Sequence, residues 1–260
     1  MLNGTFSGMP NNVLITGASR RIGRAIALAF AKEDWGVALH YHQSRKDAET
    51  LKEELAELNT RVCLVKADLS DASAVAGIIP EATANLGPLT CLVNNAAVFA
   101  KDTISDATAE SFHHHLNTNL LAPMLLTQAF AAQLPKEEQG NIVNIADQRV
   151  FNLRPDFTTY TLSKAGLWIL TQTTAMALAP DIRVNAIGPG PTLANSRQTA
   201  AQFKQQQQSV PLGYGPEPEE IAEAILFIVQ ARSMTGEFIS LDGGQHLPIF
   251  QGSAKEDAYE

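Results

Sequence analysis

Apolar and polar positions follow two alternating patterns along this chain. Short runs rich in β-branched and apolar residues, such as NVLITG at 12–17, have the length and composition of buried strands. Each run is followed by a longer stretch, such as 18–34, with apolar residues three and four positions apart, as on one face of a helix. Strands are expected at 12–17, 35–42, 61–69, 89–97, 142–145, 181–190 and 236–244, and helices at 18–34, 44–59, 71–87, roughly 108–134, 158–179 and 218–230.

This alternation of strands and helices determines the expected fold class. Consecutive β-α-β units are right-handed, and they place parallel strands in one sheet that helices cover on both faces. We therefore predict a single doubly wound, Rossmann-type α/β domain with a parallel seven-stranded sheet over residues 12–250. Residues 1–11 are expected to form a flexible N-terminal arm. The polar, acidic tail at 251–260 is expected either to be disordered or to pack on a neighbouring subunit.

One stretch, 192–215, interrupts the alternation of strands and helices. It is too long for an ordinary connection, and long insertions at the carboxyl end of such sheets often act as lids. The run of glutamines at 205–208 within it is interpreted as a solvated helical face. We therefore predict a lid insertion at about 192–215.

Composition and charge exclude several classes of protein. The 260 residues are 45% hydrophobic and 18% charged, which is typical of a globular domain. The formal charge is 19 − 27 = −8, so no overall basic field attracts nucleic acid or an anionic membrane. The N-terminal stretch lacks the features of a signal peptide, and no run of about 18 apolar residues could span a bilayer, so a cytoplasmic protein is expected. Cys63 and Cys91 lie in apolar runs, which indicates buried thiols rather than redox or metal roles.

Two residues of the helix expected at 158–179 point to proton transfer. Tyr160 and Lys164 are four positions apart, so they share one face of a helix, one turn apart. A free tyrosine has a pKa of about 10, and a neighbouring ammonium favours the phenolate, so the pair can act as an acid or a base near neutral pH. The alternative is a chance Tyr-x-x-x-Lys pattern.

The first strand-to-helix turn, TGASRRIG at 16–23, indicates a nucleotide site. Glycine in such a turn lets the backbone approach a pyrophosphate, and the free N–H groups of the helix N-terminus stabilise it. Arg21 stands where the usual fingerprint has its middle glycine. The alternative is a tight structural turn with solvated arginines.

The choice of cofactor is indicated at the end of the second strand. Sites specific for NAD usually place an acidic residue there, which binds the ribose 2′-OH. This chain has LHYHQSR instead, with no acidic residue before Asp47. His42, Ser44 and Arg45 are donors suited to a 2′-phosphate, so NADPH is the predicted cofactor.

Seven motifs in order resemble those of the short-chain dehydrogenase/reductase family. They are TG-x5-G at 16–23, ADL at 67–69, NNAA at 94–97, Asn119, Tyr160 with Lys164, GPGPT at 188–192 and LDGG at 241–244. The resemblance implies that Asp68 contacts the adenine, Asn95 lines the nucleotide cleft, Asn119 joins a proton relay, Lys164 binds the nicotinamide ribose and Tyr160 donates the proton. The residues expected to bind the cofactor are Gly17, Ser19, Arg20, Arg21, Ile22, Gly23, His40, His42, Ser44, Arg45, Asp68, Leu69, Asn95, Ala96, Pro189 and Gly190.

One departure from this family is informative about the substrate. Most members carry a serine thirteen residues before the tyrosine, and 160 − 13 = 147, where this chain has Asp147. An ionised carboxylate cannot donate to a carbonyl oxygen and repels a developing oxyanion. It suits a substrate that receives a proton on nitrogen or presents an N–H edge. Ordinary ketone reduction therefore requires a protonated Asp147.

The catalytic set Asp147, Tyr160 and Lys164 resembles that of the pteridine reductases within the family. Arg21, the HYHQS motif at 40–44 and Phe99, four residues beyond Asn95, belong to the same pattern, and the ending DGG-x-H-L at 242–247 resembles that of dihydromonapterin reductases. The resemblance implies that Arg21, Phe99, Asp147 and Tyr160 contact a pterin stacked between the nicotinamide and Phe99. Gln43 and Ala97 depart from the pattern of the parasite enzymes, where an arginine and a serine stand.

Two further readings of the function remain open from the sequence. A carbonyl or 3-oxoacyl thioester reductase of the same family is the first, and a non-catalytic NADP(H)-binding sensor is the second.

The run His113 to His115 suggests a metal site, but consecutive helical residues point about 100° apart. We therefore expect no metal there, and a helix face that is solvated or lies in an interface. The resemblance also implies a homotetramer built through the helices near Asn119 and Thr171.

Overall fold

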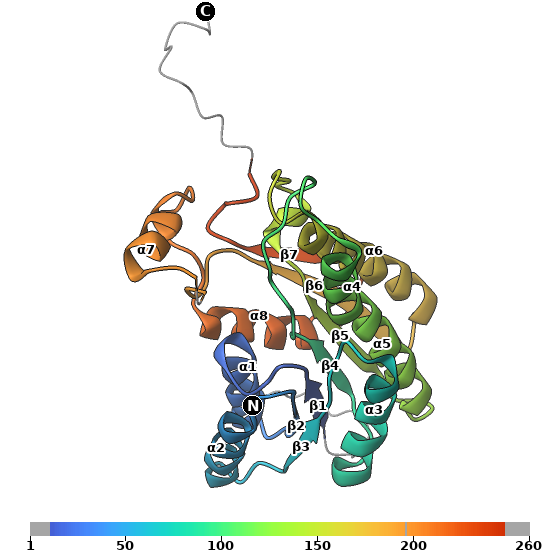
Figure 1. Cartoon of the computed structure of the whole chain (residues 1–260). Coiled ribbons are helices and arrows are strands. Elements are labelled where there is room, and N and C mark those ends of the chain that lie inside the picture. Colours follow the sequence, from blue (N-terminus) through green and yellow to red (C-terminus); the bar gives the residue numbers. More distant parts are fainter. Residues whose placement is uncertain (1–10, 196, 248–260) are drawn as a thin grey trace, which may run out of the picture.

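The protein is built on one parallel β-sheet. The computed structural model describes residues 11–195 and 197–247, and within these ranges seven strands form the sheet in the order β3-β2-β1-β4-β5-β6-β7 (Figure 1). The strands are β1 (Asn12–Ile15), β2 (Gly36–Tyr41), β3 (Val62–Lys66), β4 (Cys91–Asn94), β5 (Gly140–Ile145), β6 (Ile182–Pro189) and β7 (Phe238–Leu241). Every pairing is parallel, which confirms the predicted Rossmann-type α/β class. The arm expected at 1–11, apart from its last residue, and the tail at 251–260 lie outside the described residues.

The helices connect successive strands, as their apolar spacing predicts. They are α1 (Arg21–Lys32), α2 (Arg45–Glu57), α3 (Ala72–Leu86), α4 (Ala109–Leu116), α5 (Ala122–Gln133), α6 (Thr158–Leu178), α7 (Ala200–Gln208) and α8 (Pro218–Gln230). The helical stretch expected at 108–134 is interrupted by a π-helical turn at Asn117–Leu121. Such turns are rare and often occur at functional sites, and this one carries Asn119.

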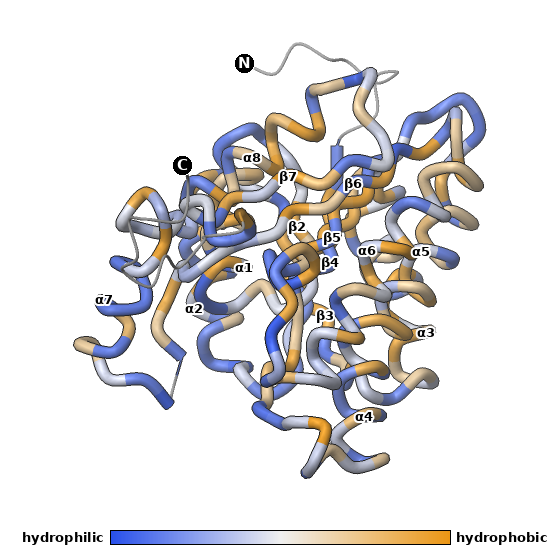
Figure 2. Tube along the Cα trace, turned by 90° about the horizontal axis from the view of Figure 1, so that it is seen from above, coloured by the Kyte–Doolittle hydropathy of each residue, from blue (hydrophilic) through white to orange (hydrophobic). Residues whose placement is uncertain are grey.

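The two faces of the sheet are covered by different helices. Val13 and Ile15 of β1 pack into a buried cluster with residues of α1 and α8, whereas Leu14 belongs to a second cluster with α3 and α5. Successive side chains of a strand point to opposite faces, so this division follows from the strand period. Figure 2 shows α1 and α2 on one side of the sheet and α3 and α5 on the other.

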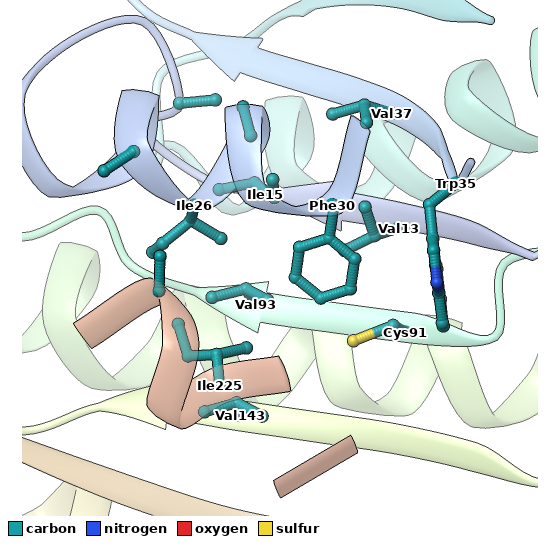
Figure 3. Packing of buried hydrophobic residues seen from close by; sticks show 14 of the residues in the cluster. Val13, Ile15, Ile26, Phe30, Trp35, Val37, Cys91, Val93, Val143 and Ile225 are labelled. Atoms are coloured by element: carbon teal, nitrogen blue, oxygen red, sulfur yellow. The ribbon is translucent and has the colours of Figure 1, made fainter. Parts of the chain in front are cut away.

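The first of these clusters is packed around an aromatic pair. Phe30 and Trp35 meet edge to face with ring centroids 5.0 Å apart. Figure 3 shows the two rings near Cys91 and Val93. Trp35 is therefore a core residue. Trp168 differs: it is only half-buried and contacts the rings of Phe151 and Phe238 at the other end of the sheet.

Both cysteines are buried, as predicted. Burial raises the pKa of the Cys63 thiol to about 11 and raises that of Cys91 further. A thiol that stays protonated at physiological pH is a poor nucleophile and a poor metal ligand. These two residues therefore serve the packing of the sheet.

The strand order reverses between β1 and β4, because β2 and β3 follow on one side of β1 and β4 to β7 on the other. In open α/β sheets a crevice forms outside the carboxyl ends of the strands at such a point, and this is where ligands bind. Strands expected to extend to residues 69 and 97 end at Lys66 and Asn94, because the chain leaves the sheet there to line this crevice. The segment 192–215 contains α7, which Figure 1 shows away from the layer of α3 and α5.

Candidate active site

The turn between β1 and α1 requires glycine at two positions. Gly17 has a φ of +62°, a left-handed conformation that glycine adopts without strain. A Cβ on Gly23 would lie 2.2 Å from the carbonyl oxygen of Gly17, which excludes a side chain. Arg20, at the N-cap of α1, makes no side-chain capping hydrogen bond, so the N–H groups of the first turn lack that partner. Such a helix start suits an anion.

Thr16 and Asn95 join the carboxyl ends of β1 and β4. Oγ1 of Thr16 accepts hydrogen bonds from the backbone N–H groups of Asn95 at 2.9 Å and Ala96 at 3.0 Å. Nδ2 of Asn95 donates in return to the carbonyl oxygens of Thr16 at 2.8 Å and Gly17 at 3.2 Å. These bonds hold Asn95 and Ala96 beside the glycine turn.

His40 supports the same turn from inside the protein. Its ring is buried, and Nδ1 accepts a hydrogen bond from the N–H of Gly17 at 3.2 Å. Nε2 then carries the proton and lies 3.3 Å from the carbonyl oxygen of Ala67. Burial lowers the pKa of His40 to about 4, so the ring is neutral at physiological pH. His40 thus holds the turn rather than presenting a charge to a ligand.

The loop after β1 meets the start of α2 through polar side chains. The hydroxyl oxygens of Ser19 and Ser44 lie 2.6 Å apart, and Nε of Arg20 donates to the carboxylate of Asp47 at 2.7 Å. Both members of this ion pair are exposed, so a competing anion could displace the carboxylate. Two hydroxyls and a guanidinium therefore lie at the position where the sequence predicts a 2′-phosphate.

Other predicted cofactor residues lie around the ends of β2 and β3. Nε2 of His42 is 3.6 Å from the Asp68 carboxylate, and both side chains are partly exposed. Leu69 is buried beside them. Arg45 is also exposed here, and its Nε donates to Glu49 at 2.7 Å, one turn further along α2. This i,i+4 pair directs the Arg45 guanidinium along the helix.

Asp147 and Tyr160 are in direct contact. Asp147 follows β5, and its Oδ1 caps the short 3₁₀ turn Gln148–Val150 by accepting from the N–H of Arg149 at 2.8 Å. Its Oδ2 accepts a hydrogen bond from the phenol of Tyr160, in the first turn of α6, at 2.7 Å. The thirteen-residue spacing thus places a carboxylate against the phenol.

Burial and this contact determine the protonation of the pair. Burial raises the pKa of Asp147, and burial together with the Asp147 charge raises the pKa of Tyr160 well above its usual value. The expectation that the neighbouring lysine favours the phenolate is therefore wrong for this structure. Desolvation and the adjacent carboxylate outweigh the opposing charge of Arg149, so Tyr160 is a phenol that can donate a proton.

Lys164 and Asn119 surround this pair. Nζ of Lys164 donates to the carbonyl oxygen of Ile145 at 2.6 Å, and burial lowers the pKa of Lys164 to about 8. Asn119 is fully buried; its Oδ1 accepts from the N–H of Val98 at 2.9 Å, and its Nδ2 donates to Oγ of Ser163 at 3.0 Å. Asn119 thus ties the segment after β4 to α6.

Phe99 lies over the pair, within a stack of aromatic rings. Its ring is parallel to that of Phe157, with centroids 4.4 Å apart, and meets Tyr160 edge to face at 4.7 Å. The guanidinium of Arg197, from the segment 192–215, lies 5.4 Å from the Phe99 centroid and donates to its carbonyl oxygen at 3.1 Å. A flat ligand that stacks on Phe99 would have to displace one of these neighbours.

Arg21 connects the glycine turn to the same segment. Its guanidinium donates to the carbonyl oxygens of Ala194 at 2.7 Å and Leu193 at 3.1 Å. Its backbone has a φ of 55°, which is unusual for a residue with a side chain and costs about 1 kcal/mol. The strained residue lies at the edge of the cleft, and its backbone conformation fixes the direction in which the Arg21 guanidinium points.

A cavity of about 280 Å³ unites part of the predicted site. It brings together Arg21, Ile22, Asn95, Phe99, Asp147, Tyr160, Lys164, Pro189 and Gly190. The remaining predicted residues lie outside it, at the glycine turn, at the ends of β2, β3 and β4, or behind the wall: Gly17, Ser19, Arg20, Gly23, His40, His42, Ser44, Arg45, Asp68, Leu69, Ala96 and Asn119. The cavity thus contains only part of the predicted site.

Comparison with known proteins identifies the family. Residues 17–246 match a family model described as enoyl-(acyl carrier protein) reductase, which is a short-chain dehydrogenase/reductase model. The chain belongs to the short-chain dehydrogenase/reductase family. It is therefore an oxidoreductase.

Solved structures similar to this short-chain reductase carry a more specific description. FolM alternative dihydrofolate reductase 1 from Brucella canis, crystallised with NADP, is 39% identical with a TM-score of 0.91, over 94% of this chain and 97% of that chain. The Brucella suis protein of the same description, also with NADP, is 40% identical with a TM-score of 0.89, over 91% and 95%. The 3-oxoacyl-(acyl-carrier-protein) reductase FabG of Staphylococcus aureus is 30% identical over 244 residues, 92% of this chain and 99% of that protein.

Several residues that line the cavity of this reductase escaped the sequence analysis. Gln148 and Arg149 line the cavity, and their place directly after Asp147 in the sequence could have predicted this. Gln206 also lines the cavity and accepts from Gln198 at 2.6 Å. The glutamine run was expected to be solvated; this is right for residues 205 and 208 and wrong for Gln206 and its neighbour at 207, which are half-buried.

The three histidines at 113–115 lie in two different environments. His113 and His114 are exposed, but His115 is fully buried, contrary to the expected solvated or interface face. Within the described residues, no cluster of three or more His, Cys, Asp or Glu side chains is arranged for a metal ion. The helices described here also include none with the length and apolar character needed to cross a membrane.

Proposed function

We propose that this chain is an NADPH-dependent reductase that transfers hydride to a pterin-type substrate, such as a dihydropterin or dihydrofolate. The observation that carries the proposal is the 2.7 Å hydrogen bond between the Tyr160 phenol and the Asp147 carboxylate, in the wall of a cavity below the Phe99 ring. A phenol paired with a carboxylate suits a substrate that is protonated on nitrogen and that presents N–H groups to an acceptor. The FolM neighbours crystallised with NADP support the same substrate class and cofactor.

The residues of the crevice fit NADP(H). The left-handed Gly17 and the helix start at Arg20 suit a pyrophosphate, and Ser19, Ser44 and Arg20 suit a 2′-phosphate. His42 and Asp68 would flank the adenosine, while Lys164 would hold the nicotinamide ribose. Bound there, the reduced nicotinamide would supply a hydride.

The proposed chemistry of the protein's own groups is a proton transfer. Tyr160 keeps its proton at neutral pH, because burial and Asp147 raise its pKa, and it donates that proton to the substrate nitrogen next to the reduced carbon. Asp147 accepts from the phenol before the transfer and orients the amino edge of the substrate. Phe99 excludes water from one face of the substrate ring, and Arg21 presents a positive charge at the edge of that ring.

A specific observation favours a second candidate, a carbonyl or 3-oxoacyl thioester reductase. Burial raises the pKa of Asp147, and a protonated carboxyl group can donate to a carbonyl oxygen. The FabG relative of Staphylococcus aureus belongs to that class by its name. A non-catalytic NADP(H) sensor is a third candidate, disfavoured by the presence of both Tyr160 and Lys164.

We also propose a cytoplasmic homotetramer. Leu162, Ile169 and Met176 are exposed at intervals of seven residues, so they lie along one stripe of α6. An apolar stripe on a long helix is typical of a surface covered by another subunit. Light scattering of the purified protein would determine the number of subunits, and a monomer at micromolar concentration would contradict this proposal.

One experiment separates the three candidate functions. NADPH oxidation is followed with dihydrobiopterin, dihydromonapterin, dihydrofolate and a panel of ketones. We expect turnover with at least one pterin or folate. Turnover with ketones alone would favour the carbonyl reductase, and binding of NADPH without any turnover would favour the sensor. Tyr160→Phe should abolish turnover, by about 10²-fold or more, and leave NADPH binding within about twofold.

A further inference from the structure

A buried chain of hydrogen bonds lies next to the Asp147–Tyr160 pair. It runs from Asp102, in the segment after β4, through Thr159 of α6 to His115 of α4, and ends at the backbone of Ala100. Thr159 Oγ1 is in short contact with Oδ2 of Asp102, His115 Nδ1 lies 2.7 Å from Thr159 Oγ1, and the N–H of Ala100 lies 3.0 Å from His115 Nε2. His115, Thr159 and Asp102 are 0%, 2% and 5% exposed.

The chemistry of the four groups in this network allows only one direction of hydrogen-bond donation. The backbone N–H of Ala100 can only donate, so Nε2 of His115 is the acceptor and Nδ1 carries the proton. The Asp102 carboxylate can only accept, so the Thr159 hydroxyl donates to it and in turn accepts from His115. Burial lowers the pKa of His115, which keeps Nε2 free to accept. Burial opposes ionisation of Asp102, but hydrogen bonds from Thr159 outweigh it and lower the pKa of Asp102.

The same network holds the start of α6 in an unfavourable conformation. Phe157 precedes the helix with a φ of 60°, which is rare for a bulky aromatic residue. Its N–H donates to the carbonyl oxygen of Asp102 at 2.7 Å, and the N–H of Thr159 donates to Oδ1 of Asp102 at 3.1 Å. An isolated bridge between Thr103 and Asp156 lies alongside. Asp102 therefore caps α6 from outside the helix.

Two site residues are direct neighbours of this network in the chain. Ala100 follows Phe99, and Thr159 precedes Tyr160. The Phe99 ring in turn stacks on Phe157, whose backbone Asp102 holds. Any shift of Ala100 relative to Thr159 therefore changes the distance between the aromatic ring and the phenol, which lie 4.7 Å apart.

We propose that Asp102, Thr159 and His115 are positioning residues that fix the Phe99 ring against the Tyr160 phenol and so determine how tightly the substrate is held. The inference rests on the proposed function, because it assigns the network a role in binding the pterin-type ring. None of the three residues touches the reacting atoms. Their effect is expected in the KM for that substrate rather than in the binding of NADPH, because the phosphate groups of NADPH are assigned to the glycine turn and the start of α2, away from this network.

A matched set of threonine variants tests the proposal. Thr159→Val removes the hydroxyl and keeps the shape, whereas Thr159→Ser keeps the hydroxyl. Thr161→Val is the control, because Oγ1 of Thr161 is buried two residues further along α6 with no hydrogen-bond partner among the described residues. We expect Thr159→Val to raise the KM for the pterin substrate about tenfold or more, with a smaller fall in kcat and an NADPH Kd within about twofold. Thr159→Ser and Thr161→Val should stay within about twofold of the wild type.

Amide hydrogen exchange without substrate tests the same network independently of the reaction. Ala100 and Phe157 should exchange faster in Thr159→Val than in Thr159→Ser or the wild type. His115→Gln keeps an acceptor for the N–H of Ala100, whereas His115→Leu does not, so the Ala100 amide should exchange faster in the leucine variant. If Thr159→Val does not fold, this pair of variants tests the proposal in its place. If the wild-type protein turned over no pterin, the proposed function would be rejected. The exchange rates would still test whether the network holds Ala100 and Phe157. Equal KM values in Thr159→Val and Thr159→Ser, or slow Ala100 exchange in both Thr159→Val and His115→Leu, would overturn the inference.

Discussion

The phenol of Tyr160 donates to Oδ2 of Asp147 across 2.7 Å, and this direction of donation decides what the pair can do. A tyrosine that donates to a carboxylate is protonated, and burial of both groups keeps it so at neutral pH. The pair is therefore suited to delivering a proton in a reduction. Its oxygens also present acceptors to a ligand with N–H groups, which a serine at position 147 would do less strongly.

Replacement of Asp147 tests this relationship directly. Asp147→Asn keeps the shape but removes the charge, and we expect kcat/KM with a pterin substrate to fall about 10²-fold, with NADPH binding unchanged. Since burial raises the pKa of Asp147, its carboxylate opposes folding at neutral pH, so the Tm of Asp147→Asn should equal or exceed that of the wild type. Asp147→Ser should lose pterin turnover and gain turnover of ketones. A lower Tm together with intact pterin turnover would contradict the assigned role.

Lys164 should make stability depend on alkaline pH. Burial lowers its pKa in the folded protein to about 8, whereas an unfolded lysine titrates near 10.4. The unfolded state binds more protons between these values, so the contribution of Lys164 to stability is lowest below pH 8 and rises towards pH 10.5. Lys164→Met should therefore raise the Tm relative to the wild type by roughly 3–8 °C at pH 7 and by much less at pH 10. A constant difference across this range would mean that the ammonium is not destabilised by burial.

Arg21 combines backbone strain with a function at the cleft, and the two can be separated. Arg21→Gly relieves the left-handed φ of 55° and removes the hydrogen bonds to Leu193 and Ala194. Relief of strain offsets the loss of these partly exposed bonds, so we expect a Tm within a few degrees of the wild type. The KM for the substrate should rise about tenfold. Arg21→Ala keeps the strain and should be less stable than Arg21→Gly; the reverse order of the two Tm values would contradict this account.

Arg20 should decide between the two nicotinamide cofactors. Its guanidinium is paired with the exposed carboxylate of Asp47, in the first turn of α2, and Ser44 at the N-cap of that helix contacts Ser19. Arg20→Ala should weaken NADPH binding about tenfold and leave NADH binding unchanged, because only NADPH carries the 2′-phosphate. Arg24→Ala is the matched control, since Arg24 pairs with Glu54 between α1 and α2, at 2.6 Å, and should affect neither cofactor. Equal losses for NADPH and NADH in Arg20→Ala would place the arginine elsewhere in the cleft.

The sequence by itself determined the fold class and the chemical type of the central pair. Hydrophobic periods of two and of 3.6 residues reflect local backbone geometry, so the strands, the helices and the parallel sheet followed from them. Tyr160 and Lys164 needed only a helix to share a face. The pairing of Asp147 with Tyr160 was implied by the resemblance to the family, and it holds here because the end of β5 and the first turn of α6 lie within one β-α unit.

Only the tertiary structure decided the protonation of Tyr160, the contacts of Arg197 and Gln206, and the burial of His115. The pKa of Tyr160 depends on how much water several elements exclude together, and no single segment contains that information. Arg197 reaches Phe99 across 98 residues of sequence. His115 is one of three identical neighbours in the chain, and only the packing of α4 against α6 determines which ring turns inward to meet Thr159. Periodicity shows which face of a helix is buried, but the partner of a buried polar group depends on which segments the fold brings together.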